Sequence, residues 1–241
     1  MSQKTFRHIQ RDLDSFLPNV QVRRAFDVGG NVGQTVAALR ASFPASEIWT
    51  FEPVATAYRE LEERTRTLEN VHCFNVALGS SDGRGIVTAH GTSPTNHVIT
   101  ESIADATVVN RSGEQEVEMV TGDSFCLRHG VETINYLKID TEGHELQVLR
   151  GFHGMLGRFA IELLELEVGM NWDNRRQVPM ERVKGYLEPM GYYVFRFYEQ
   201  VAERRGRPHL RRADAVFLSR PTIEANIRPF GPPAGEVDLT A

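Results

Sequence analysis

The sequence predicts an α/β fold with a mostly parallel sheet and helices on both faces. Apolar runs of strand length alternate with helical segments from residue 24 to residue 190, which is typical of a parallel sheet. Turns rich in glycine follow some of these runs directly, as at residues 29–33. The last two apolar runs, 192–198 and 213–218, have no helical segment between them, which predicts an antiparallel hairpin at the end of the sheet.

Composition and charge exclude several classes of protein. The 241 residues suffice for one large α/β domain, and the net charge of −5 gives no basic excess. We therefore expect no nucleic-acid partner. No apolar run approaches the roughly 20 residues that span a bilayer, and the N-terminus is too polar for a signal peptide, so a cytoplasmic protein without a membrane span is expected. Cys73 and Cys126 form no C-x-x-C pair and are expected to be reduced core residues.

The first helices and strands are predicted from the spacing of apolar residues and from the turn residues between them. Apolar residues at helical spacing predict a helix over residues 5–17, in an N-terminal segment (1–23) that covers the cleft or the sheet edge. A strand is then predicted at the short apolar run before the first glycines, and a helix follows the glycine turn. The next predicted elements are a helix at 54–68 between strands at 47–51 and 71–77.

The turn in the stretch FDVGGNVGQT is the first candidate site. Gly29, Gly30 and Gly33 can adopt positive φ and lack a Cβ, so a ligand can lie against the backbone N–H groups of the helix start. Asp27 ends the strand before this turn, and Glu52 ends the next strand, where an acid suits ribose hydroxyls. The spacing is not the G-x-G-x-x-G that frames a pyrophosphate. These features suit a cationic ligand with a ribose and no phosphates, such as S-adenosylmethionine.

The middle of the chain departs from the alternation of strands and helices. Strands are predicted at 85–90 and 116–120, and the polar loop 91–115 between them is expected to cover a substrate. Asn96 and His97 of this loop are the side chains expected to reach the cleft. A short helix is predicted to start near residue 121, with Asp123 or Ser124 as its cap.

The stretch LKIDTEGHELQVLRG is the second candidate site. It is predicted as a strand, a turn and a helix that ends near Gly151. Asp140, Glu142, His144 and Glu145 then gather at the carboxyl end of one strand, a concentration of charge that is costly unless it serves a function. The next apolar run, IELLELEV, predicts a further strand.

With both stretches described, the sequence resembles the FkbM family of S-adenosylmethionine-dependent methyltransferases. The resemblance covers roughly residues 24–170 and is carried by FDVGGNVGQT, FEP, NVALG and above all LKIDTEGHELQVLRG, in which Asp140, Glu142, Gly143 and Glu145 match the family's D-x-E-G-x-E core. It implies a class I methyltransferase, Rossmann-like sheet of seven strands over residues 24–220, followed by a tail at 221–241. It also implies methyl transfer to hydroxyl groups, often those of sugars.

The residues expected to bind the cofactor follow the strand ends. The glycine turn is expected at the methionine end, Glu52 at the ribose and the loop after the third strand at the adenine. The full set is Asp27, Gly29, Gly30, Asn31, Gly33, Thr35, Glu52, Pro53, Asn75, Val76, Ala77 and Asp140. Asn75 has a turn role as its alternative.

Methyl transfer needs an acceptor oxygen held opposite the sulfur, and a base or metal to help its proton leave. Asp140 is expected nearest the methyl group, with Glu142 beside it and His144 as the base, because an imidazole suits neutral pH. A divalent metal is the alternative route. Candidate oxygen ligands for Mg²⁺ are Asp140, Glu142 and one of Glu165 or Glu167.

The expected partner is a small-molecule acceptor, first of all a glycosylated compound, with a peptide, a polyketide or another non-sugar compound as the alternative. Trp172 follows the IELLELEV strand and is expected to stack on a sugar ring. A homodimer is left open. Two other classes of protein also stay open: an NAD-dependent oxidoreductase, which would share the turn and the acid, and a catalytically inert cofactor-binding module.

Overall fold

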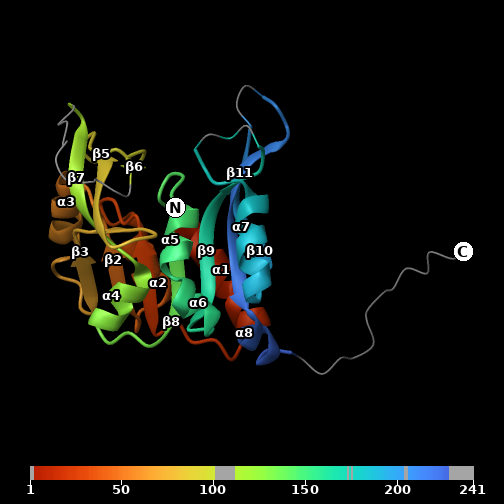
Figure 1. Ribbon diagram of the computed structural model, residues 1–241. Coiled ribbons are helices and arrows are strands. Elements are labelled where there is room, and N and C mark those ends of the chain that lie inside the picture. Colours follow the sequence, from red (N-terminus) through yellow and green to blue (C-terminus); the bar gives the residue numbers. More distant parts are fainter. Residues whose placement is uncertain (1–2, 101–111, 173, 175, 204–205, 228–241) are drawn as a thin grey trace, which may run out of the picture.

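The computed structural model describes residues 3–100, 112–172, 174, 176–203 and 206–227 (Figure 1). Residues 101–111 of the predicted substrate loop and residues 228–241 of the predicted tail lie outside this range.

The described chain is organised around a large sheet of seven strands in the order β10-β11-β9-β8-β1-β2-β3. Five of them run parallel: β1 (Arg24–Val28), β2 (Glu47–Phe51), β3 (Val71–Phe74), β8 (Ile134–Ile139) and β9 (Ile161–Gly169). β11 (Leu210–Ser219) is antiparallel to both of its neighbours, β9 and β10 (Tyr192–Ala202). The predicted α/β fold with a C-terminal hairpin is confirmed.

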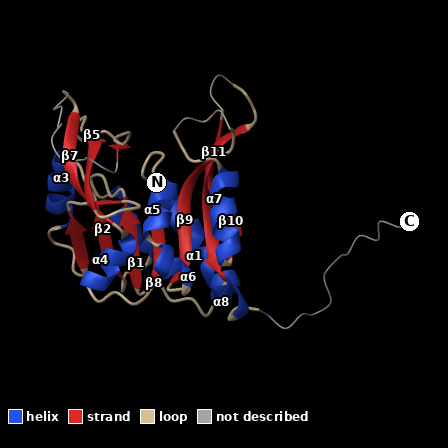
Figure 2. Ribbon diagram, viewed as in Figure 1, coloured by secondary structure: helices blue, strands red, loops and turns tan. Residues whose placement is uncertain are grey.

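Helices cover both faces of this sheet (Figure 2). One apolar cluster joins the sheet to α1 (Gln3–Phe16), α2 (Gln34–Ser42) and α3 (Ala55–Thr65). The other joins it to α4 (Gly122–Arg128), α5 (Glu145–Gly151), α6 (His153–Gly157) and α7 (Met180–Leu187). A 3₁₀ turn, η1 (Glu188–Met190), leads into β10, and α8 (Arg220–Glu224) follows β11, so the predicted tail begins inside a helix. None of the described helices is long and apolar enough to cross a membrane.

The N-terminal helix packs on a face of the sheet. Phe6, Ile9 and Leu13 recur at helical spacing and are buried in the cluster that contains α2. At the far side of α1, the Tyr198 hydroxyl of β10 donates a 3.0 Å hydrogen bond to Asp12 Oδ2. α1 therefore ties the outermost strand to the core.

A second sheet of four strands, order β4-β7-β5-β6, stands beside the first: β4 (Ala77–Leu78), β5 (Gly83–Thr88), β6 (Val98–Thr100) and β7 (Glu114–Val120). The predicted third strand is therefore split, because β3 ends at Phe74 and Ala77 already pairs in the other sheet. β6 was not predicted. In Figure 1, β5, β6 and β7 rise on one side of the carboxyl ends of the large sheet and the β10–β11 hairpin rises on the other.

The predicted cap of α4 is wrong by two or three residues. Thr121 has the extended backbone of a capping residue, and its Oγ1 accepts a 3.1 Å hydrogen bond from Ser124 N. Asp123 instead accepts hydrogen bonds from Gly154 N and Met155 N, at 2.6 and 2.8 Å, and so holds the start of α6.

Candidate functional site

The glycine turn brings three strand ends together. Gly29 and Gly33 have φ near +90°. A Cβ on Gly29 would overlap the carbonyl oxygen of Asp140, and one on Gly30 would overlap Thr50 Oγ1. The N–H groups of Gly29 and Gly30 both donate to Phe51 O at 2.9 Å. At Gly29 and Gly30, Asp140 and Thr50 occupy the space that a Cβ would fill, and Phe51 O accepts the two N–H groups. Both glycines also line a cavity, so their contact with a cofactor stays a prediction.

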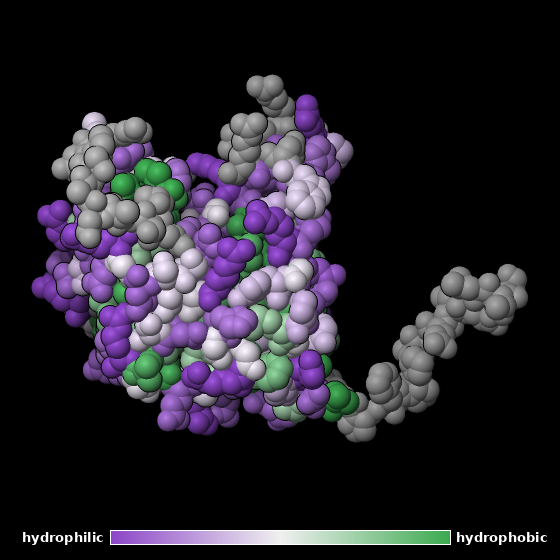
Figure 3. All heavy atoms as spheres, in the orientation of Figure 1, coloured by the Kyte–Doolittle hydropathy of each residue, from purple (hydrophilic) through white to green (hydrophobic). Residues whose placement is uncertain are grey.

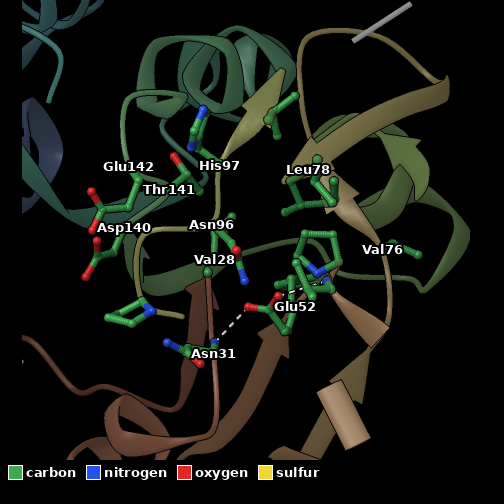
Figure 4. A pocket seen from close by; sticks show the side chains of 18 of the residues that line it. Val28, Asn31, Glu52, Val76, Leu78, Asn96, His97, Asp140, Thr141 and Glu142 are labelled. Carbon is green, nitrogen blue, oxygen red and sulfur yellow. Dashed lines mark hydrogen bonds between the residues drawn. The ribbon is translucent and has the colours of Figure 1, made fainter. Parts of the chain in front are cut away.

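Glu52 is fixed by the backbone around it. Its Oε2 accepts a 2.9 Å hydrogen bond from Asn31 N, drawn in Figure 4, and its Oε1 accepts one of 2.8 Å from Val54 N. The side chain is 6% exposed, and burial raises its pKa to about 7. Asn75 Nδ2 donates to the carbonyl oxygens of Glu52 and Pro53, at 2.8 and 3.0 Å, so Asn75 holds this turn.

Glu52 opens into a cavity that we call the apolar cleft (Figure 4). Its polar lining includes Asn96 and His97, which reach it from the small-sheet side. No lysine or arginine is among its described lining residues. Most of its wall is apolar, supplied by the ends of β1 and β2, the Val54 turn and the small sheet: Val28, Phe51, Pro53, Val54, Val76, Ala77, Leu78, Val87, Pro94 and Val98.

A second cavity, the charged cavity, adjoins the cleft. Gly29, Asn31, Pro94, Asp140 and Glu142 line both of them. The remaining lining residues of the charged cavity are Gly30, Gln34, Thr35, Thr95, Glu167, Arg176, Glu199, Arg212 and Asp214. They come from the turn before α2 and the start of α2, from the segment before β6, from the segment between β9 and α7, and from β9, β10 and β11. Figure 3 shows the surface hollowed between the two raised parts of the molecule.

Asp140 contacts a buried row of charges. Lys138 Nζ lies 2.9 Å from Asp140 Oδ2, and Lys138 is 2% exposed. Burial alone would raise the pKa of Asp140, but the charge and hydrogen bond of Lys138 outweigh it and lower the pKa below its ordinary value. Lys138 also pairs in register with Asp27 on one side and Glu165 on the other. Asp140 therefore stays ionised at the boundary between the two cavities.

Glu145 fixes the turn that follows β8. Its Oε1 accepts hydrogen bonds from Thr141 N, Gly143 N and Thr141 Oγ1, at 3.1, 3.0 and 3.2 Å. Burial raises the pKa of Glu145 to about 7. The turn holds Glu142 at a φ of 53° and Gly143 at 109°, and Glu142 Oε2 lies 3.8 Å from Arg176 Nε. The D-x-E-G-x-E core thus has separate parts: Asp140 and Glu142 line the cavities and Glu145 supports them.

Most of the predicted site residues come together at these cavities, but six do not line either one. Asp27 is fully buried beneath the turn, accepts a 3.1 Å hydrogen bond from Thr50 Oγ1, and has its pKa raised by burial to about 6. Glu165 is also buried and accepts a hydrogen bond from the Tyr136 hydroxyl. The others are Gly33, Asn75, His144 at the start of α5, and Trp172, which is 72% exposed.

The predicted metal ligands separate into two groups. Asp140, Glu142 and Glu167 can each place a carboxylate oxygen within 4.8 Å of the others. Glu165 lies apart from them. Each of the three carboxylates already faces a cationic side chain: Lys138 for Asp140, Arg176 for Glu142 and Arg212 for Glu167.

Sequence reasoning missed both arginines of the charged cavity, Arg176 and Arg212, and also Asp214 in its wall. It also missed Lys138, which pairs with Asp140. One signal was present for Asp214, which interrupts the apolar run of β11, where an unpaired carboxylate is costly.

The match to known proteins decides the family. The family model described as "Methyltransferase FkbM domain" matches residues 27–194. The chain belongs to the FkbM methyltransferase family. It is 26% identical over 152 residues to "Hexuronic acid methyltransferase AglP" of Haloferax volcanii, covering 61% of this chain and 56% of that protein. It is also 26% identical over 196 residues to "Methyltransferase sdnD" of Sordaria araneosa, covering 70% of this chain and 73% of that protein.

The chain spans little more than half of the first of these relatives, AglP. Among solved structures, an S-adenosylmethionine-dependent methyltransferase from Clostridium acetobutylicum matches with a TM-score of 0.50 and 8% identity, covering 91% of this chain and 92% of that one. At that identity the likeness concerns the fold alone.

Proposed function

We propose that this chain transfers a methyl group from S-adenosylmethionine to a hydroxyl group of a small molecule. The observation that carries the proposal is the chemistry of the two adjoining cavities. The apolar cleft presents Glu52 and no lysine or arginine among its described lining residues, and both arginines of the charged cavity face carboxylates. Such a site favours a cation with a neutral nucleoside and disfavours the pyrophosphate of a dinucleotide.

The residues present fit each part of this cofactor. The carboxylate of Glu52 can accept hydrogen bonds from ribose hydroxyls, because each of its oxygens receives a single backbone hydrogen bond. The apolar wall around Val76, Ala77 and Leu78 suits an adenine ring. Ionised Asp140, at the junction of the cavities, favours a positive charge. When bound, the cofactor supplies an activated methyl group, and the chain's task is to orient the acceptor.

Calorimetry tests the cofactor directly. We expect S-adenosylmethionine and S-adenosylhomocysteine to bind and NAD not to bind. Glu52→Ala should weaken binding about tenfold, as expected for a hydrogen bond to a charged group. Glu47→Ala is the matched control, because Glu47 starts the same strand at its opposite end. Binding of NAD alone would favour the oxidoreductase instead.

For the acceptor, we propose a sugar hydroxyl. The support is that a similar protein is named a hexuronic acid methyltransferase, and that the charged cavity offers many hydrogen-bonding groups for a polyol. Release of S-adenosylhomocysteine should be faster with methyl glycosides than with peptides or with water alone. Cofactor binding without release in the presence of any of these acceptors would favour an inert module.

A Mg²⁺ ion bound by Asp140, Glu142 and Glu167 is a second candidate for activating the acceptor, because their oxygens can gather within 4.8 Å. Against it stand the cationic side chains that already face all three carboxylates. Turnover with and without a chelator separates the routes: loss of turnover that Mg²⁺ restores would favour the metal, and unchanged turnover would exclude it.

A further inference from the structure

Asp214 is a buried acid without a partner inside the charged cavity. It lies on β11 opposite Glu167 of β9 and is 4% exposed. It lines the charged cavity. Glu167, its neighbour, has both Arg212 and a 2.7 Å hydrogen bond from Gln177 Nε2. Among the described residues, no side chain or backbone group makes a hydrogen bond or an ion pair with the Asp214 carboxylate.

The groups around Asp214 make it a stronger base than an ordinary carboxylate. Burial raises the pKa of Asp214, with further increases from Glu165 of β9, Asp140 of β8 and Glu199 of β10, and Lys138 of β8 opposes them. Arg212 and Glu167, which also line this part of the cavity, form a pair with each other. Asp140 behaves differently, because Lys138 holds it ionised.

We propose that Asp214 receives the proton of the acceptor hydroxyl, which enters the charged cavity between Asp214 and Asp140. This inference rests on the proposed methyl transfer. As the acceptor oxygen forms its bond to the methyl carbon, the carbon–sulfur bond breaks and its electron pair goes to sulfur, giving neutral S-adenosylhomocysteine. The hydroxyl proton passes to an Asp214 carboxylate oxygen, so both charge and atoms balance.

Asp214 lies outside residues 27–194, the segment that matches the family model. His144, the base expected from the sequence, lines neither cavity. Asp214 is therefore a catalytic candidate supplied by the C-terminal hairpin, whereas the cofactor side of the site comes from the β1, β2 and β8 ends.

An experiment without an acceptor tests the location. A sulfonium beside Asp214 lowers its pKa, so S-adenosylmethionine should release more protons on binding than S-adenosylhomocysteine, which lacks the sulfonium. Calorimetry in two buffers of different ionisation enthalpy measures this difference. Asp214→Asn should abolish this difference in proton release. Asp12→Asn, which removes a comparably buried acid that lines neither cavity, should keep it.

If Asp214→Asn showed the same difference in proton release between the two ligands as the wild-type protein, the inference would be overturned. If neither S-adenosylmethionine nor S-adenosylhomocysteine bound to the wild-type protein, the proposed function would be overturned instead.

Turnover tests the role. The acceptor is methyl β-D-glucopyranoside or methyl β-D-glucuronide, whichever the wild-type protein methylates faster. The rate of S-adenosylhomocysteine release is measured. Asp214→Asn should lower kcat about 100-fold or more with the affinity for S-adenosylhomocysteine kept. It should also lose the rise in kcat between pH 6 and pH 8, which Asp214→Glu should restore in part. If a folded Asp214→Asn protein kept both its kcat and the rise in kcat between pH 6 and pH 8, another group would be the proton acceptor.

Discussion

The apolar cleft and the charged cavity share five lining residues, yet they are built in different ways. In the cleft, backbone hydrogen bonds fix the key acid, because Asn31 N and Val54 N both donate to Glu52. In the charged cavity, side chains from separate strands fix one another, as Arg212 of β11 does with Glu167 of β9. The first arrangement depends on local turns and the second on the register of the sheet. Changes to the turns should therefore damage the cofactor site, and changes to the charges should damage turnover.

The largest effect should come from the turn itself. Gly29→Ala places a Cβ against the Asp140 carbonyl oxygen and forces a φ of +91° on an alanine. Overpacking and backbone strain together should lower the free energy of unfolding by about 4 kcal/mol and abolish cofactor binding. Urea denaturation and calorimetry measure both.

The matched control for the turn is Gly130→Ala. Gly130 has a φ of +65°, but a Cβ there meets no atom within 4 Å. Strain alone should then cost about 1 kcal/mol. Equal losses for the two variants would show that close contact with β8 contributes nothing at Gly29.

A smaller effect is expected at the residue where the two cavities meet. Asp140→Asn keeps the shape of the side chain but removes the charge beside Lys138. We expect S-adenosylhomocysteine release to fall at least about 100-fold, because preorganised charge at a reaction centre has effects of this size. Cofactor affinity should stay within about threefold. If turnover were intact, Asp140 would not belong to the reaction centre.

The pH dependence of binding isolates Glu52. Its folded pKa is about 7, so the carboxylate that accepts ribose hydrogen bonds is present above pH 7 and lost as the pH falls through 7. Affinity for S-adenosylhomocysteine should therefore fall about tenfold from pH 8 to pH 6. S-adenosylhomocysteine is chosen because it lacks the sulfonium, so that Asp214 contributes little. Glu52→Gln should bind more weakly and without this slope, and a slope that survived the substitution would assign the titration elsewhere.

The contrast between the cavities also explains what the sequence could predict. Gly29, Glu52 and Asp140 stand at strand ends inside short contiguous motifs, so the periodicity of the chain placed them correctly at one edge of the sheet. Arg212 and Asp214 meet Glu167 only through the antiparallel pairing of β11 with β9. No spacing in the sequence encodes that register, because it is set by the packing of the whole sheet.

The same reasoning applies to Asn75 and to the glycines. The motifs marked these positions, but their protein contacts were not predicted in detail: Asn75 holds the Glu52 turn, and Gly29 and Gly30 let Asp140 and Thr50 approach. A contact of that kind depends on which strand ends become neighbours, and this follows only from the sheet order.

The smallest effect is expected at Trp172, which is 72% exposed and lines neither cavity. If its ring stacks on a sugar at the rim, Trp172→Ala should raise KM for the methyl glycoside about threefold, which corresponds to the lower end of an aromatic contact. Neither kcat nor cofactor affinity should change, because Trp172 lines neither cavity. An unchanged KM would place the acceptor wholly inside the charged cavity, and a lower kcat would mean that Trp172 orders the hairpin that carries Asp214.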